Sequence, residues 1–147
     1  MKGAMADYYT NFSFIIPIKD PVQSEYVLDI AQTANVHRFE QDQLPPSFPS
    51  ELREHLEDWR FEVERCEEGI WLHSEEGGVD AVCAFVQHLI QKFAIPGPIA
   101  FEWSHDCSKP RTDAFGGGAA IIMATEIKIM TTCDWLRQQT AHETVQA

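Results

Sequence analysis

The segment from Val79 to Phe93 carries the strongest periodic pattern in the chain. Its apolar residues recur at helical spacing and form one stripe: Val82, Val86, Leu89, Ile90 and Phe93. Asp80 lies in the first turn, where the helix dipole favours a carboxylate, and Pro96-Gly97-Pro98 ends the pattern. A helix with one apolar stripe has to bury it against another element. The rest of the chain must therefore supply an apolar face for this helix to cover.

Segments with strand-like alternation supply that face. In residues 11–18 the apolar side chains share one side: Phe12, Phe14, Ile16 and Ile18. Trp59, Phe61 and Val63 alternate with polar residues before a turn at 67–69, which predicts a β-hairpin. In chain order, we expect strands over residues 11–18, 59–64, 70–73, 99–105, 119–124 and 127–130. We expect helices over residues 21–35, 51–58 and 79–93, and from residue 131 or 132 onward.

This order of elements predicts an α+β fold. The first six principal elements match a split βαββαβ core, to which a C-terminal hairpin and helix are appended. We expect a mostly antiparallel sheet with helices on one face, formed by a single domain over residues 1–147. At 147 residues the chain is long enough to bury a substantial core. The ends, residues 1–10 and 140–147, are expected to fray.

The net charge of −12 is concentrated in one stretch. Residues 38–80 hold thirteen Asp or Glu against four Lys or Arg, which gives −9 of the total. A phosphate backbone is repelled by such a surface, so we expect no direct nucleic-acid binding. Solubility alone can explain the charge. The functional alternative is a surface that meets a basic protein partner, or that mimics nucleic acid to occupy a protein that binds it.

Nothing in the sequence indicates export or a membrane. Apolar runs such as 119–124 are far shorter than the roughly 20 residues of a membrane helix, and the N-terminal residues turn polar before a signal-peptide core forms. We therefore expect a cytoplasmic protein. The four cysteines are widely scattered, and free thiols are the expectation in a reducing compartment.

The densest collection of chemically useful residues is the segment 104–118, which joins two predicted strands. We predict a ligand site here, formed by His105, Cys107, Lys109, Arg111, Asp113, Gly116 and Gly117. The basic pair and the backbone N–H groups of the glycines could hold a carboxylate or a phosphate. The alternative is structural: a carboxylate pairs with Arg111, and the glycines allow a tight turn or a close backbone approach.

A catalytic role for this segment finds less support in the sequence. If the strand continues through Cys107, then His105 and Cys107 project from the same face and could form a Cys–His pair. No third residue that would orient the pair is identifiable, and a structural Cys107 is the expected alternative. Catalytic residues therefore stay unassigned.

The sequence also shows no pattern typical of a metal site, a catalytic carboxylate pair or an aromatic binding surface. The Cys and His spacings fit no structural zinc site, so neither a metal nor another cofactor is expected. Paired carboxylates such as Glu67-Glu68 lie at predicted turns, where they are normally solvated. Trp59, Trp71 and Trp103 fall on predicted strands, where packing between elements is the expected role.

One segment resembles known sequences. Residues 101–118 read F-E-W-S-H-D-C-S-K-P-R-T-D-A-F-G-G-G, which is similar to a segment of small uncharacterised bacterial proteins often carried on mobile elements. The resemblance also takes in the later Trp135-Leu136 and brings no known activity. It implies a bacterial, cytoplasmic setting and an accessory role of a phage or plasmid.

Two functions from different classes follow from these patterns. The first is a non-enzymatic accessory or interaction protein whose acidic surface engages a macromolecular partner. The second is a binder of a small anionic ligand, or an unrecognised enzyme, centred on residues 104–118. We favour the first because no complete catalytic set can be assembled from the sequence. The oligomeric state is open.

Overall fold

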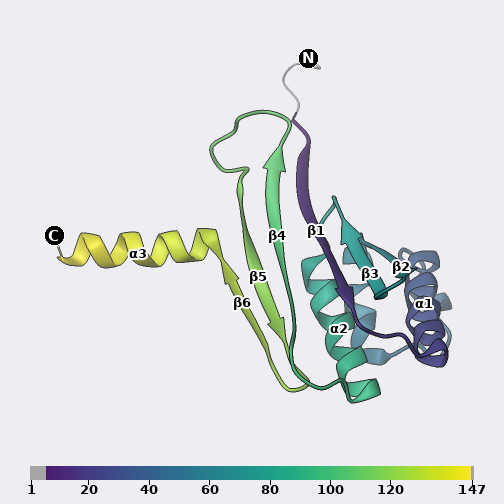
Figure 1. The fold of residues 1–147 in the computed structure, drawn as a ribbon. Coiled ribbons are helices and arrows are strands. Elements are labelled where there is room, and N and C mark those ends of the chain that lie inside the picture. The colour runs from purple at the N-terminus through teal and green to yellow at the C-terminus, as the bar shows by residue number, and fades with distance from the viewer. Residues whose placement is uncertain (1–5, 147) are drawn as a thin grey trace.

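The computed structural model describes residues 6–146. The six strands are β1 (Tyr8–Ile16), β2 (Glu62–Cys66), β3 (Gly69–Ser74), β4 (Ile99–Cys107), β5 (Gly116–Ile122) and β6 (Ile127–Thr131). The helices are α1 (Pro21–Val36), α2 (Val79–Phe93) and α3 (Thr132–Gln146), with two 3-10 helices, η2 (Gln41–Gln43) and η3 (Ser50–Asp58). Figure 1 shows their arrangement.

All six strands form one antiparallel sheet in the order β2-β3-β1-β4-β5-β6. Strands β1 to β4 and helices α1 and α2 make the predicted split βαββαβ core. The β5–β6 hairpin then continues the sheet beyond β4, and α3 follows directly from β6 (Figure 1). The predicted α+β fold class is therefore confirmed.

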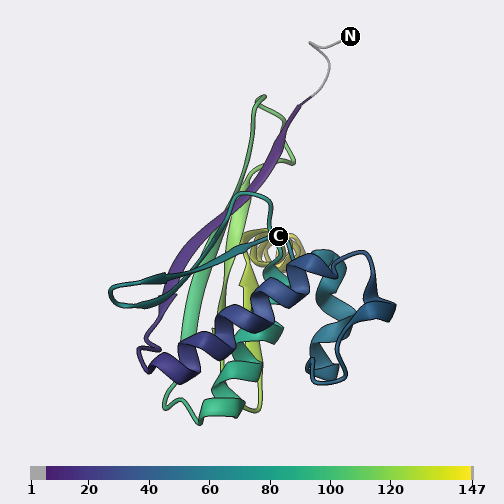
Figure 2. The ribbon, with the colours of Figure 1, turned by 90° about the vertical axis from the view of Figure 1, so that its right-hand side faces the viewer.

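Helices α1 and α2 cover one face of the sheet, which we call the helix face, and leave the other face open (Figure 2). The predicted stripe of α2 packs into the core, where Val82, Val86 and Leu89 are fully buried. Helix α2 ends at Ala94, whose φ of 49° is left-handed. Figure 1 shows α3 extending away from this two-layered body, past the β6 edge of the sheet.

The predicted start of the first hairpin strand, at residue 59, is wrong. Strand β2 begins at Glu62, so Trp59 and Phe61 precede it rather than lying on it. Both side chains are buried between the sheet and α2, where Trp59 packs against Phe61 and Phe85 at ring-centroid distances of 4.8 and 4.9 Å. Burial of these large rings, rather than strand pairing, accounts for the apolar alternation in this segment.

The glycine-rich end of segment 104–118 also differs from expectation. Strand β4 continues through Cys107, and β5 already begins at Gly116, so Gly116, Gly117 and Gly118 are strand residues. The indole of Trp103 lies against Gly118, leaving no room for a side chain there. At the ends of the chain, β1 begins at Tyr8 and α3 extends to Gln146. Residues 1–5 and 147 lie outside the described residues, and the fraying expected over residues 1–10 and 140–147 stays a prediction.

Candidate functional site

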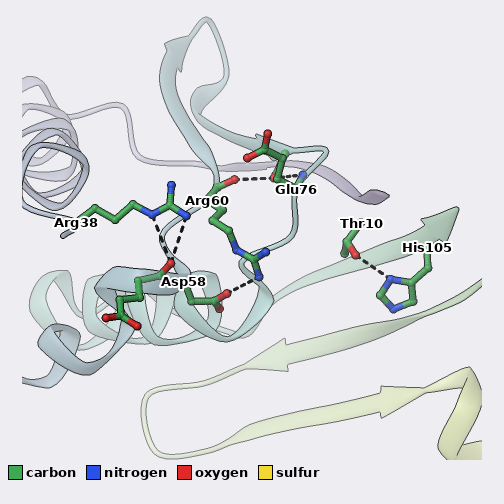
Figure 3. Close-up of polar contacts among 8 residues, drawn as sticks. Thr10, Arg38, Asp58, Arg60, Glu76 and His105 are labelled. Carbon is green, nitrogen blue, oxygen red and sulfur yellow. Dashed lines mark hydrogen bonds and ion pairs between the residues drawn. The ribbon is translucent and has the colours of Figure 1, made fainter. Parts of the chain in front are cut away.

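The residues of the predicted loop site are spread over the end of β4, the connecting loop and the start of β5. His105 and Cys107 lie on the same face of β4, both half-buried, as expected for a strand that continues to Cys107. The Nδ1 atom of His105 is 2.9 Å from Oγ1 of Thr10, its register partner on β1 (Figure 3). Gly116 lies opposite His105 on the other side, on β5.

The remaining predicted residues follow along the loop. Lys109 is half-buried, and Arg111 and Asp113 are exposed. The backbone N–H of Arg111 donates to the carbonyl of Lys109 at 2.8 Å, which forms a tight turn. Gly117 is buried in the sheet. Two hollows of the described surface are lined by other side chains, and a ligand role for these seven residues stays a prediction.

The first of these hollows lies over strands β1 and β3 and has a volume of about 750 Å³. We call it the Trp71 hollow. Its lining comes from β1, from the start and end of the β2–β3 hairpin, and from the turn that precedes α2: Asn11, Phe12, Ser13, Arg60, Glu62, Trp71, His73, Ser74, Glu75 and Glu76.

The floor of the Trp71 hollow is a fixed aromatic pair. Trp71 and His73 are two residues apart on β3, so both project to the open face, and their rings stack at 3.7 Å with an interplanar angle of 22°. The indole Nε1 of Trp71 donates to Oγ of Ser13 at 2.8 Å, and Nε2 of His73 is hydrogen-bonded to Glu64. Each ring is thus held by a polar partner on a neighbouring strand.

Carboxylates dominate the charge around this aromatic pair. Glu62, Glu75 and Glu76 are exposed, and none of the three forms an ion pair with the described residues. The single cation in the lining, Arg60, is paired with Asp58 at 2.7 Å (Figure 3). The hollow therefore combines an aromatic surface with an excess of negative charge.

The turn that carries these carboxylates is fixed to the sheet. Oγ of Ser74 donates to the carbonyl of Arg60 and accepts from the backbone N–H of Glu76, both at 2.9 Å (Figure 3). The N–H of Thr10 donates to the carbonyl of Glu75, and the N–H of Gly77 donates to the carbonyl of Thr10. The backbone that positions Glu75 and Glu76 is therefore held on both sides.

A second hollow of about 630 Å³ lies between η3, α2 and β6. Beside it lies a chain of hydrogen bonds that no spacing in the sequence indicates. The hydroxyl of Tyr26 is 2.7 Å from Nε2 of His88, and Nδ1 of His88 is 2.6 Å from Oε1 of Glu51. Burial raises the pKa of Tyr26, with a further contribution from Glu51. The hydroxyl therefore stays protonated at neutral pH, and the chain ties α1, α2 and η3 together.

Glu51 and Cys83 also line this second hollow, and the pKa of each group is shifted. A hydrogen bond from its own backbone N–H lowers the pKa of Glu51, and the bond to His88 acts in the same direction. Burial raises the pKa of the Cys83 thiol to about 12, with a smaller contribution from Asp80. A thiol with this pKa is protonated at neutral pH and is a poor nucleophile.

Among the described residues, no group of three or more His, Cys, Asp or Glu side chains is arranged to hold a metal ion. Between residues 6 and 146, no helix has both the length and the apolar character needed to cross a membrane. Comparison of the chain with protein-family models, curated proteins and solved structures found no match.

Proposed function

We propose that this chain is a non-enzymatic interaction protein that binds a basic protein partner through the Trp71 hollow. The observation that carries the proposal is the fixed Trp71–His73 stack beside three carboxylates that no cation of the described residues neutralises. An arginine or lysine of the partner would lie against the aromatic pair and be surrounded by Glu62, Glu75 and Glu76. This proposal gives the acidic surface predicted from the sequence a defined point of contact.

Physical chemistry favours a cationic guest in this hollow over an anionic one. A cation on an aromatic face gains about 0.5–1 kcal/mol at an exposed site and about 2 kcal/mol or more when water is excluded. Arginine suits the hollow best because its planar guanidinium stacks on aromatic rings and still donates to carboxylates. The same carboxylates repel phosphate groups, which supports a protein partner rather than a nucleic acid.

The proposed cellular role, that of a bacterial accessory protein, rests on the sequence. The segment at residues 101–118 resembles small bacterial proteins of mobile elements, and this favours an accessory protein that acts on a partner in the cytoplasm. The hydrogen-bonded chain of Tyr26, His88 and Glu51 supports a non-enzymatic reading, since its three groups satisfy one another and join structural elements.

Binding of an oligo-arginine peptide, followed by fluorescence anisotropy over a salt series, tests this function. We expect the wild-type protein to bind the peptide at low salt and to lose affinity as salt screens the exposed carboxylates. Trp71→Ala leaves the net charge at −12 and should still weaken binding, because the aromatic surface is removed. The triple variant Glu62→Gln, Glu75→Gln, Glu76→Gln should weaken it further.

A matched control separates the hollow from the overall charge. Glu25, Glu54 and Glu57 are also exposed but do not line the Trp71 hollow, so replacing all three with Gln gives the same net charge as the first triple variant. The control should retain most of the binding. Equal losses in the two triple variants, or unchanged binding by Trp71→Ala, would contradict the proposed function.

A further inference from the structure

A different part of the molecule points to a second interaction. We propose that two copies of this chain pair along the exposed edge of β6 and that α3 of each copy packs on the other. The proposal rests on the unpaired edge, the exposed apolar side chains around it, the low charge of this end of the chain and the position of α3. It is independent of the Trp71 hollow.

The two edges of the sheet differ in how well they are protected. Sheet edges are normally guarded by charged side chains, because an unpaired edge can add a strand from another molecule. The outer strand β2 carries Glu62, Glu64 and Arg65 among its five residues. The other outer strand, β6, reads Ile-Lys-Ile-Met-Thr and has Lys128 as its only charge. The β6 edge is therefore the open one.

Exposed apolar side chains gather at this same edge. Ile129 and Met130 on β6 are 50% and 52% exposed, and Ile121 on the neighbouring β5 is 42% exposed. In α3, Trp135 and Leu136 are 54% and 57% exposed. Ile129 lies on the helix face, whereas Ile121 and Met130 lie on the open face, so exposed apolar side chains flank the β6 edge on both sides.

A strand identical to β6 is a suitable partner for this edge. Antiparallel pairing centred on Ile129 places Ile129 opposite its own copy and Lys128 opposite Met130 of the second copy. The two lysines then avoid each other, and their aliphatic stems lie beside the methionines. Such a twofold contact uses the same residues on both copies and closes on itself, so it stops at a dimer.

Charge also favours a second copy at this end. Residues 116–147 contain three Asp or Glu and two Lys or Arg, a net charge of −1, whereas residues 38–80 carry −9. β6 and α3 themselves therefore add little repulsion between two copies, although Ile129 shares the second hollow with carboxylates of η3 and α2.

Helix α3 is left largely uncovered by the described residues of its own chain. All its residues from Thr132 to Glu143 are exposed, and isolated helices of about 12–15 residues are marginal in water. Figure 1 shows α3 extending past β6 in the direction where an added strand would lie. A five-residue strand pair is small beside a standard interface of roughly 1,600 Å². Trp135 and Leu136 would supply the additional contact on the second copy.

Sedimentation velocity over a concentration series tests the proposal on the full chain. The wild-type protein should shift from monomer to dimer as its concentration rises. Ile129→Lys places two like charges across the twofold axis and should raise the dimer dissociation constant by about tenfold or more. Ile15→Lys is the matched control, since Ile15 is 43% exposed on β1, away from the β6 edge, and should leave the dissociation constant unchanged.

Two variants at one position test the register. Met130→Glu would face Lys128 of the second copy and should keep the dimer, whereas Met130→Lys would face a like charge and should disrupt it. These two variants decide the question if circular dichroism shows that Ile129→Lys does not fold. A wild type that stays monomeric, an Ile129→Lys dimer as tight as wild type, or equal dissociation constants for the two Met130 variants would each overturn the proposal.

Discussion

Replacing Gly118 with Ala tests whether close packing, rather than turn formation, requires the glycines that open β5. A Cβ at this position would lie 2.6 Å from the carbonyl oxygen of Met130 and 2.8 Å from Cε2 of Trp103. Both distances are shorter than a carbon atom tolerates without movement of its neighbours. The carbonyl oxygen belongs to β6 and the indole is packed in the core, so neither can move away freely.

The expected cost follows from two opposing effects. In a strand interior, Ala is normally more stable than Gly by about 0.5–1 kcal/mol, because Gly loses more backbone entropy on folding. Overpacking costs about 1–3 kcal/mol, and this rigid site belongs near the upper end of that range. We therefore expect Gly118→Ala to lower the free energy of unfolding by about 2 kcal/mol. For a domain of this size that corresponds to a fall in Tm of roughly 4–8 °C.

Urea denaturation of four proteins gives a decisive measurement: wild type, Gly118→Ala, Trp103→Leu and the double variant. The smaller leucine should leave room for the added methyl group, so Gly118→Ala should cost less in the Trp103→Leu background, with a coupling of about 1 kcal/mol. A Gly118→Ala protein as stable as wild type would refute the packing argument. So would a cost that is the same with Trp or Leu at position 103.

Two further predictions concern stability. Leu89→Ala in the fully buried stripe of α2 should lower the free energy of unfolding by about 2–5 kcal/mol, and an unchanged urea midpoint would remove Leu89 from the core. The pKa of Glu51 is lowered in the folded state, so its stabilising contribution is present above its ordinary pKa of 4.5 and is lost as the pH falls through the lowered value. The difference in unfolding free energy between wild type and Glu51→Gln should therefore be largest near neutral pH and shrink with acidification; a difference independent of pH would contradict this.

The periodic parts of the fold could be predicted from the sequence because local pattern and tertiary burial agree there. Helix α2 has the predicted bounds, since one apolar stripe meets one covered face of the sheet. The sequence leaves two roles open for the glycines at 116–118, a tight turn or a close backbone approach, because a run of glycines fits both. The close approach at Gly118 comes from Trp103, fifteen positions earlier. A contact between strands leaves no mark on the local pattern.

The candidate site could not be predicted for a related reason. Alternation along β3 shows that Trp71 and His73 share a face, but it does not say which face the helices cover. Packing is the usual role of a strand tryptophan, so the sequence predicts packing for Trp71. The hydrogen-bonded chain of Tyr26, His88 and Glu51 joins residues that are distant in the sequence, and no spacing rule connects them.

If the chain both binds a partner at the Trp71 hollow and pairs along the β6 edge, the dimer fixes the distance between its two hollows. A twofold axis through a pair of antiparallel edge strands is perpendicular to the sheet, so the open faces of the two copies lie on the same side. Each Trp71 hollow is on β3, and the order of strands puts nine strand spacings between the two hollows. At about 4.8 Å per spacing they would be roughly 43 Å apart before twist is considered. An extended basic segment of the partner needs about 13 residues to span that distance. A shorter segment would bind one hollow only. A longer segment could occupy both hollows, and its affinity would rise because the second hollow is held at a high effective concentration.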